Sequence, residues 1–323
     1  MHSNFLKASD GVVVAELLRD GITESFHHGV VAVVDSRGAT LLEKGNPDAI
    51  VYPRSTLKPF QALAVLATGI ELSPLELALT SASHCGSLRH REAIDNFLTR
   101  WGLSASQLQC PVDWPLGVVE RAEMSASDGA PSRLAMNCSG KHAGFLAACI
   151  HAGFDPSTYL DPEHPLQKLI VDTISTYTGE TPAFTSRDGC GAPLHALSVR
   201  SLARGLAKLV QGATVHEKAL LSAVADNAWA LDGDGRDNTV TIETLGGIAK
   251  IGAEGLVVIA VPSGVAVALK ILDGSMRATS LVALASLAQV GAISESQHDD
   301  LAARMAFPVK GGDATIGGLQ VRL

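Results

Sequence analysis

The chain has 323 residues, of which 46 % are hydrophobic and 18 % are charged, and its formal net charge is −8. This composition supports a sizeable buried core and argues against nonspecific nucleic-acid binding, which requires Lys and Arg to neutralise phosphates. Five cysteines are an odd number, and the first residues contain no apolar signal segment. We therefore expect free thiols and a cytoplasmic location. The most apolar stretch, residues 255–272, is interrupted by Pro262 and Gly264, so we expect no membrane span.

Strand patterns come first along the chain. Residues 11–17, 29–35 and 39–43 are separated by turns, and the first two are rich in β-branched side chains, which predicts a meander of about three strands. Residues 54–66 then switch to the apolar spacing of a helix.

The middle of the chain, residues 72–235, has mainly helical patterns. Ser73, Pro74 and Glu76 combine the N-cap, N1 and N3 signals of a helix start. Residues 194–209 and 215–231 have the spacing of amphipathic helices.

Strand patterns return after residue 246. Residues 256–261 and 265–272 predict a hairpin, and a helix is expected from about residue 276 to 290. This order predicts the α+β class: an antiparallel sheet flanked by helices, with an inserted helical region. We expect one domain over residues 1–323, with the N- and C-terminal strands in one sheet and residues 72–235 mainly helical.

The segment Arg54-Ser55-Thr56-Leu57-Lys58 places a serine three residues before a lysine. Positions i and i+3 share one helix face, so the hydroxyl and the amine would point into the same space. A neutral amine can take the proton of a serine, and Ser-x-x-Lys is the nucleophile signature of penicillin-recognising hydrolases. The pattern alone is also that of an ordinary helix start.

A second lysine, Lys250, precedes the predicted hairpin in Lys250-Ile251-Gly252. Lys-x-Gly on a core strand is the usual partner of Ser-x-x-Lys, although a strand-end lysine in solvent fits equally. Ser83, in a small polar segment after an apolar run, is a candidate second hydroxyl facing a lysine.

Two cysteines lie in segments with candidate metal ligands. Cys138 precedes Lys141 by three residues, and Cys190 lies in the glycine-rich segment Asp188-Gly189-Cys190-Gly191. Thiolates and a deprotonated amine can bind zinc, although buried structural cysteines are the commoner explanation of this spacing. The segment Asp232-Gly233-Asp234-Gly235-Arg236 lacks the spacing of a calcium loop and predicts a turn-rich loop.

Together these segments resemble one family, the Rhizobium-etli-type L-asparaginases (asparaginase II family, class 3). The resemblance rests on five ordered motifs: Arg54-Ser55-Thr56-Leu57-Lys58-Pro59, Ser83-His84, Asn137-Cys138-Ser139-Gly140-Lys141-His142, Asp188-Gly189-Cys190-Gly191-Ala192-Pro193 and Lys250-x-Gly252-Ala253-Glu254-Gly255.

The resemblance implies a fold similar to serine β-lactamases and glutaminases, and hydrolysis of L-asparagine to L-aspartate and ammonia. It implies a homodimer and two Ser-Lys pairs, in which Ser55 is the nucleophile with Lys58 as its base, and Ser83 pairs with Lys250. It also implies one zinc ion per chain near the site, held by Cys138, Lys141 and Cys190.

Further substrate-binding residues follow from chemistry. Arg54 can hold the α-carboxylate as a fork-shaped donor, and Asp188 or Glu254 can receive the α-ammonium. His84 and His142 complete the set of substrate-binding candidates, His142 as a residue behind the site. The chain departs from many members of the family at Cys85, Ser87 and Asn238, which we expect to line or support the pocket.

Two other functions use the same residues. A glutaminase or a β-lactam-type hydrolase would share Ser55 and Lys58, whereas a non-catalytic zinc-binding protein would need only Cys138, Lys141 and Cys190.

Overall fold

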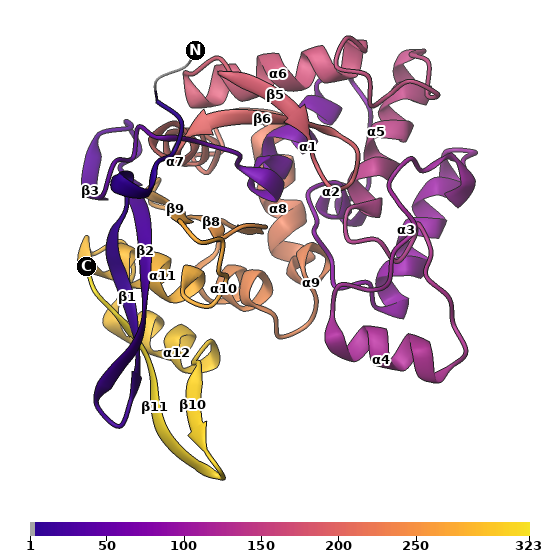
Figure 1. Cartoon of the computed structure of the whole chain (residues 1–323). Coiled ribbons are helices and arrows are strands. Elements are labelled where there is room, and N and C mark those ends of the chain that lie inside the picture. Colours follow the sequence, from indigo (N-terminus) through magenta and orange to yellow (C-terminus); the bar gives the residue numbers. More distant parts are fainter. Residues whose placement is uncertain (1–3) are drawn as a thin grey trace.

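A computed structural model describes residues 4–323, and its main sheet joins strands from both ends of the chain (Figure 1). The eight strands pair in the order β10-β11-β1-β2-β9-β8-β7, with β3 also paired to β2, and every pairing is antiparallel. These strands are β1 (Val12–Arg19), β2 (Ile22–Val34), β3 (Thr40–Lys44), β7 (Ile248–Gly252), β8 (Leu256–Ala260), β9 (Ala266–Ile271), β10 (Pro308–Gly311) and β11 (Ala314–Val321).

Helices cover both faces of this sheet. Residues 29–34 of β2 are all buried although their side chains alternate between the faces, and both α7 (Val199–Leu209) and α11 (Thr279–Gln289) pack on β2 and β9. A strand that is covered on both faces can carry an uninterrupted apolar run. The helix α12 (Glu295–Arg304) packs against α11.

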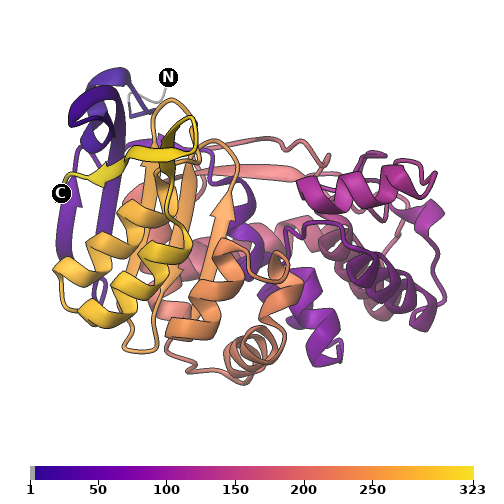
Figure 2. The same cartoon turned by 90° about the horizontal axis from the view of Figure 1, so that it is seen from below.

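The helical region lies beside the sheet, as Figure 2 shows. Its helices are α1 (Lys58–Leu66), α2 (Pro74–Thr80), α3 (Leu88–Arg100), α4 (Val118–Ala126), α5 (Ser139–Ala152), α6 (Pro165–Thr178), α8 (Val215–Asp226), α9 (Ala228–Leu231) and α10 (Asp237–Leu245). A small second sheet, in the order β4-β6-β5, consists of β4 (Ile50–Val51), β5 (Phe184–Arg187) and β6 (Pro193–Ser198). In residues 4–323 there is no helix with the length and apolarity that crossing a bilayer requires.

The α+β class, the antiparallel sheet, the meander β1-β2-β3 and the hairpin β8-β9 are confirmed. The single amphipathic helix predicted for residues 194–209 is wrong in its first part, because Pro193–Ser198 forms β6. All six residues of β6 are buried, so their apolar run does not reveal whether the chain is extended or helical. The helix predicted over residues 215–231 is broken at Asn227, where the backbone leaves the helical conformation with φ −134° and ψ 41°.

The C-terminal hairpin of β10 and β11 was not predicted. Its residues are mostly exposed or half-buried, and the segment contains four glycines, so it lacks the apolar alternation of a half-buried strand. The strand β11 depends on its pairing with β1, which is distant in sequence.

Close packing of α2 against α5 determines where the segments after α2 and before α5 meet. A Cβ atom added at Gly140 would lie 2.5 Å from Leu79 O, and one added at Gly144 would lie 2.4 Å from Thr80 Oγ1. These glycines let the two helices approach closely, and the approach places Ser83, after α2, near Cys138, before α5.

We expect Gly144→Ala to lower the free energy of unfolding by about 1–3 kcal/mol, because the new methyl group overpacks the contact with Thr80. Urea denaturation monitored by circular dichroism would measure the change. An unchanged midpoint would show that α2 and α5 can separate at no cost. Ser125→Ala, which introduces an alanine at an exposed position of α4, is the control.

Candidate active site

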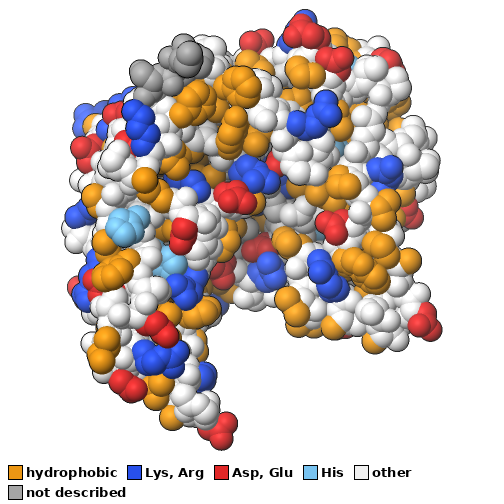
Figure 3. All heavy atoms as spheres, in the orientation of Figure 1, with side chains coloured by type: hydrophobic (Ala, Val, Ile, Leu, Met, Phe, Trp, Pro, Cys, Tyr) orange, Lys and Arg blue, Asp and Glu red, His pale blue; other side chains and the backbone are white. Residues whose placement is uncertain are grey.

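A cavity of about 890 Å³ brings together residues from distant parts of the chain. Figure 3 shows this face of the molecule hollowed between its two halves. The residues lining the cavity include seven that the sequence analysis selected as site residues, namely Arg54, Ser55, Ser83, Cys138, Asp188, Cys190 and Glu254. Two hydroxyls and two sulfurs therefore face one space.

The Ser-x-x-Lys segment forms a short 3₁₀ helix, Arg54–Leu57, that leads directly into α1 at Lys58. Ser55 lines the cavity, whereas Lys58 is 1 % exposed. Lys58 Nζ donates to Ser83 Oγ at 2.8 Å and to Ala82 O, and it lies 3.2 Å from Cys138 Sγ. The hydrogen bond of this amine thus goes to Ser83, and no described residue is bonded to the Ser55 hydroxyl.

Lys250 lies in β7, at the edge of the main sheet, and is fully buried. Its Nζ donates to Ile251 O at 2.8 Å. Burial, and next the charge of Lys58, lower the pKa of Lys250 to about 7. Burial also lowers the pKa of Lys58, and the charge of Lys141 lowers it further. Buried amines of this kind can be neutral near neutral pH, which a general base requires.

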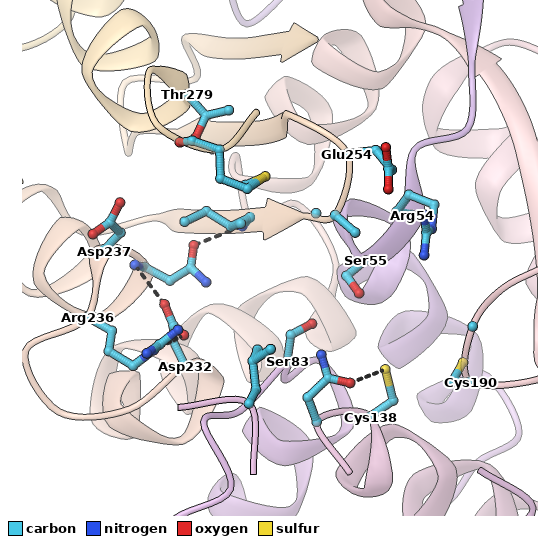
Figure 4. Close-up of a pocket in the computed structure, with 18 of the residues that line it drawn as sticks. Arg54, Ser55, Ser83, Cys138, Cys190, Asp232, Arg236, Asp237, Glu254 and Thr279 are labelled. Carbon is cyan, nitrogen blue, oxygen red and sulfur yellow. Dashed lines mark hydrogen bonds and ion pairs between the residues drawn. The ribbon is translucent and has the colours of Figure 1, made fainter. Parts of the chain in front are cut away.

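Arg54 and Asp188 form an ion pair at one end of the cavity. Arg54 Nε donates to Asp188 Oδ1 at 2.8 Å. Burial alone would raise the pKa of Asp188, but the charges of Lys141 and Arg54 lower it overall. Figure 4 places Glu254 beside Arg54 at the same end.

Both Arg54 and Glu254 have left-handed backbone conformations, with φ values of +55° and +63°. Such conformations are costly for residues other than glycine, and they persist where the surrounding structure holds them, often at functional sites.

The two thiols and Lys141 form a buried cluster. Lys141 Nζ donates to Cys190 Sγ at 3.0 Å, and a hydrogen bond from Cys138, followed by the Lys141 charge, lowers the pKa of Cys190 to about 5. That bond and burial raise the pKa of Cys138, which stays a thiol. Burial alone would lower the pKa of Lys141, but Cys190 and Cys138 raise it overall. The cluster is a thiolate–ammonium pair beside a neutral thiol.

The sequence profile of the L-asparaginase II family matches residues 15–321, nearly the whole chain. The chain belongs to the L-asparaginase II family. Membership makes the protein a hydrolase with a small-molecule substrate. A search of the curated proteins returned no match.

Among solved structures, the chain is similar to a β-lactamase from Mycobacterium bovis at 15 % identity, with a TM-score of 0.45, covering 81 % of this chain and 94 % of that one. It is similar to Mglu in its glutamate form at 14 % identity and a TM-score of 0.45, covering 81 % of this chain and 60 % of Mglu. It is also similar to EstCE1, described as a hydrolase with promiscuous acyltransferase activity, at 11 % identity and a TM-score of 0.37, covering 81 % of this chain and 89 % of that one.

The chemistry of Cys138, Lys141 and Cys190 is compatible with the zinc site that the sequence analysis predicts. Its two sulfurs and one nitrogen are buried and close enough to bond one another, and Cys190 is already ionised at neutral pH. Within residues 4–323 there is no group of three His, Cys, Asp or Glu side chains that could hold a metal ion, so a zinc site here requires the lysine.

The two candidate histidines lie behind the cavity, and neither is among the residues that line it. His84 Nε2 is 2.9 Å from Ser139 Oγ, and His142 Nδ1 is 2.7 Å from Tyr159 Oη. Burial lowers the pKa of both imidazoles well below the usual value, so they are neutral at physiological pH. In these positions they support the segments that carry Ser83 and Lys141.

The sequence analysis did not assign a site role to the loop that follows α9. Asp232, Arg236, Asp237 and Asn238 all line the cavity. The first three lie opposite the Arg54 end (Figure 4), and the Asn238 backbone N–H donates to Asp232 Oδ2. The loop was predicted as turn-rich, and only the departure at Asn238 from the family pattern indicated a position in the pocket.

We expect stability to rise with pH between about pH 7 and 10 because of Lys250. In the unfolded chain this lysine keeps its proton up to its ordinary pKa of 10.5, whereas the folded protein releases it near 7. The unfolded state therefore binds more protons in this window, and the free energy of unfolding increases as pH rises.

Lys250→Met should weaken this dependence, flattening the curve by about 1 kcal/mol or more over the window. The lowered pKa of Lys58 leaves a remaining slope. Urea unfolding at several pH values measures it, with the exposed Lys168→Met as the matched control. Parallel curves for Lys250→Met and the wild type would contradict the low pKa.

Proposed function

We propose that the protein is an L-asparaginase, which hydrolyses the side-chain amide of L-asparagine to L-aspartate and ammonia. The observation that carries this proposal is the meeting of Ser55, Ser83 and two buried lysines at one cavity in a member of the L-asparaginase II family. The family supplies the reaction class, and burial lowers the pKa of both amines, which favours the neutral form that a base needs.

In this proposal Ser55 is the nucleophile, because its hydroxyl faces the cavity and has no bonded partner among the described residues. Lys58, in its neutral form, takes the Ser55 proton as the oxygen attacks the amide carbon. The proton then passes to the departing ammonia. Water hydrolyses the resulting ester, and the same amine accepts the proton of that water.

Ser83 and Lys250 form the second part of the same network. The hydrogen bond from Lys58 to Ser83 Oγ supports this arrangement, because it connects the two expected Ser-Lys pairs through one amine. Ser83 can pass protons between the lysines, and Lys250 favours a neutral Lys58 because two ammonium groups this close repel each other.

Charged groups at one end of the cavity are suited to the amino-acid part of the substrate. Arg54 binds the α-carboxylate through the guanidinium nitrogens that Asp188 leaves free. Asp188 or Glu254 receives the α-ammonium. His84 and His142 contribute from behind the cavity by holding Ser139 and Tyr159.

Cys138, Lys141 and Cys190 would hold a zinc ion next to the substrate. When bound, zinc supplies a positive charge that can polarise or orient the substrate. Lys141 and Cys138 must then release their protons, so zinc affinity should increase with pH.

We expect Ser55→Ala to lower kcat for L-asparagine by about 10³-fold or more, because a covalent hydrolase without its nucleophile loses the acyl-enzyme route. Ser83→Ala should cost less, about 10–100-fold, because the proposed nucleophile Ser55 and its proposed base Lys58 are both retained. Ammonia release in a coupled assay measures both.

A larger loss in Ser83→Ala than in Ser55→Ala would reverse the roles of the two serines. L-glutamine and a chromogenic β-lactam belong in the same panel, because faster turnover of either would replace asparagine as the substrate. Ser286→Ala, a buried serine of α11 that bonds Val282 O, is the matched control.

We expect the purified wild type to contain about one zinc per chain and Cys190→Ser to lose it, because a serine hydroxyl is not ionised at neutral pH. Atomic absorption after dialysis measures the content. Cys149→Ser, inside α5, is the control. Equal zinc in both variants would show that Cys190 is not a ligand. Stoichiometric zinc without turnover of any amide would favour a binding protein over an enzyme.

A further inference from the structure

Two arginines at opposite ends of the cavity are held in the same way. Arg54 Nε donates to Asp188 Oδ1 at 2.8 Å, and Arg236 Nε donates to Asp232 Oδ1 at 2.6 Å. In each case the aspartate occupies only the Nε side of the guanidinium. Figure 4 shows the two arginines on opposite sides of the cavity.

The terminal nitrogens of Arg236 are free to bind a ligand. Within residues 4–323 no acceptor is bonded to them, and the side chain is 38 % exposed at the cavity. Burial alone would lower the pKa of Arg236, but Asp232 raises it overall, so the guanidinium is charged. A guanidinium with free terminal nitrogens is a fork-shaped donor for a carboxylate.

Asn238 adds a second donor at the same end. The residue is 2 % exposed, and its Oδ1 accepts a hydrogen bond from Ile251 N at 2.8 Å. Its backbone N–H donates to Asp232 Oδ2 at 3.3 Å. These bonds orient the amide, and Nδ2 has no acceptor among the described residues although Asn238 lines the cavity. Because Asn238 Nδ2 reaches the cavity, it can donate to an acceptor on a ligand.

The negative charges near this end include Asp232, Asp237 and Glu120, the last through its charge on Arg236. Asp232 accepts from Arg236 and from the Asn238 backbone, and Asp237 Oδ2 accepts from Ser280 Oγ at 2.6 Å. Among the described residues, the Arg236 terminal nitrogens and Asn238 Nδ2 are donors without an acceptor, and these donors suit a carboxylate ligand.

Ser55 and Ser83 lie between the two arginines (Figure 4). L-asparagine has a single carboxylate, which the Arg54 end accommodates. Cavities of about 300–1,000 Å³ hold molecules much larger than one amino acid, and this cavity of about 890 Å³ is in that range. The second donor set thus has no partner in L-asparagine itself.

We propose that the Arg236–Asn238 end is a leaving-group subsite, and that the enzyme also hydrolyses β-aspartyl dipeptides, in which the side-chain carboxyl of L-aspartate is joined to the α-amine of a second amino acid. This rests on the proposed amidohydrolase function. The aspartyl carboxylate binds Arg54, the carboxylate of the second residue binds Arg236 and Asn238 Nδ2, and the amide lies at the serines.

The reaction is the same as with asparagine. The serine oxygen forms a bond to the amide carbon, the carbon–nitrogen bond breaks, and the released amine takes the serine proton. Water then cleaves the ester, so the net products are L-aspartate and a free amino acid.

The test compares kcat/KM for L-asparagine, β-L-aspartyl-glycine and the β-methylamide of L-aspartate, whose leaving amine has no carboxylate. We expect β-aspartyl-glycine to exceed the methylamide by at least about tenfold, since a charge-assisted hydrogen bond contributes about that factor. Arg236→Met should remove this preference, and Arg89→Met, an arginine outside the cavity, should retain it.

Because Arg236→Met leaves Asp232 without its ion pair, Asn238→Asp provides a second variant. It keeps an oxygen for Ile251 N but replaces the free donor with a negative charge, so the preference should again fall at least about tenfold. If Asn238 served only to hold Ile251, Asn238→Asp would keep the wild-type preference.

The outcomes separate the two proposals. Turnover of L-asparagine with no preference for β-aspartyl-glycine over the methylamide would overturn the leaving-group subsite and leave the asparaginase proposal standing. A preference that survives both Arg236→Met and Asn238→Asp would also overturn the subsite. No turnover of any of the three amides would overturn the amidohydrolase function itself.

Discussion

The site depends on three buried lysines that lie behind the lining of the cavity. Lys58, Lys141 and Lys250 are each no more than 2 % exposed, and a buried ammonium is costly without a negative partner. Lys141 has such partners, namely the Cys190 thiolate that it bonds and the nearby charge of Asp188. Lys58 and Lys250 are left without a carboxylate in hydrogen-bond contact, so burial lowers the pKa of both. Lys141 is thus part of an ion pair, whereas Lys58 and Lys250 are available as bases.

Helix packing creates this arrangement. The glycine contacts between α2 and α5 place Ser83 and Cys138 on either side of Lys58, whose amine reaches both. The edge strand β7 then closes the other side with Lys250. A shift of either helix would change the distances from Lys58 to Ser83 and to Cys138. The geometry of the proposed catalytic groups therefore depends on the contact between α2 and α5.

Much of the site could be predicted from short motifs. Ser55, Lys58, Cys138 and Cys190 occur in segments whose spacing carries a chemical meaning, and the family resemblance put those segments in order. The partner of Lys58 could not be predicted in this way. The Ser-x-x-Lys spacing predicts Ser55 as the hydrogen-bond partner of Lys58, whereas the Lys58 amine bonds Ser83. The 3₁₀ helix Arg54–Leu57 precedes Lys58, and the lysine side chain extends to the segment after α2. The donor set of Arg236 and Asn238 was also missed, because a polar turn gives no local sign of the side chains it faces.

The sequence by itself determined the α+β class, the strand meander, the β8-β9 hairpin and the identity of the reactive groups, since these follow from local periodicity and from residue types at fixed spacing. Only the tertiary structure decided which lysine bonds which serine, that β6 replaces the start of a predicted helix, and that β11 joins β1. It also decided that two arginines bound to aspartates lie at opposite ends of one cavity. The reason is physical: hydrogen bonds between distant segments, and the pKa shifts that burial produces, depend on contacts that the order of residues does not express.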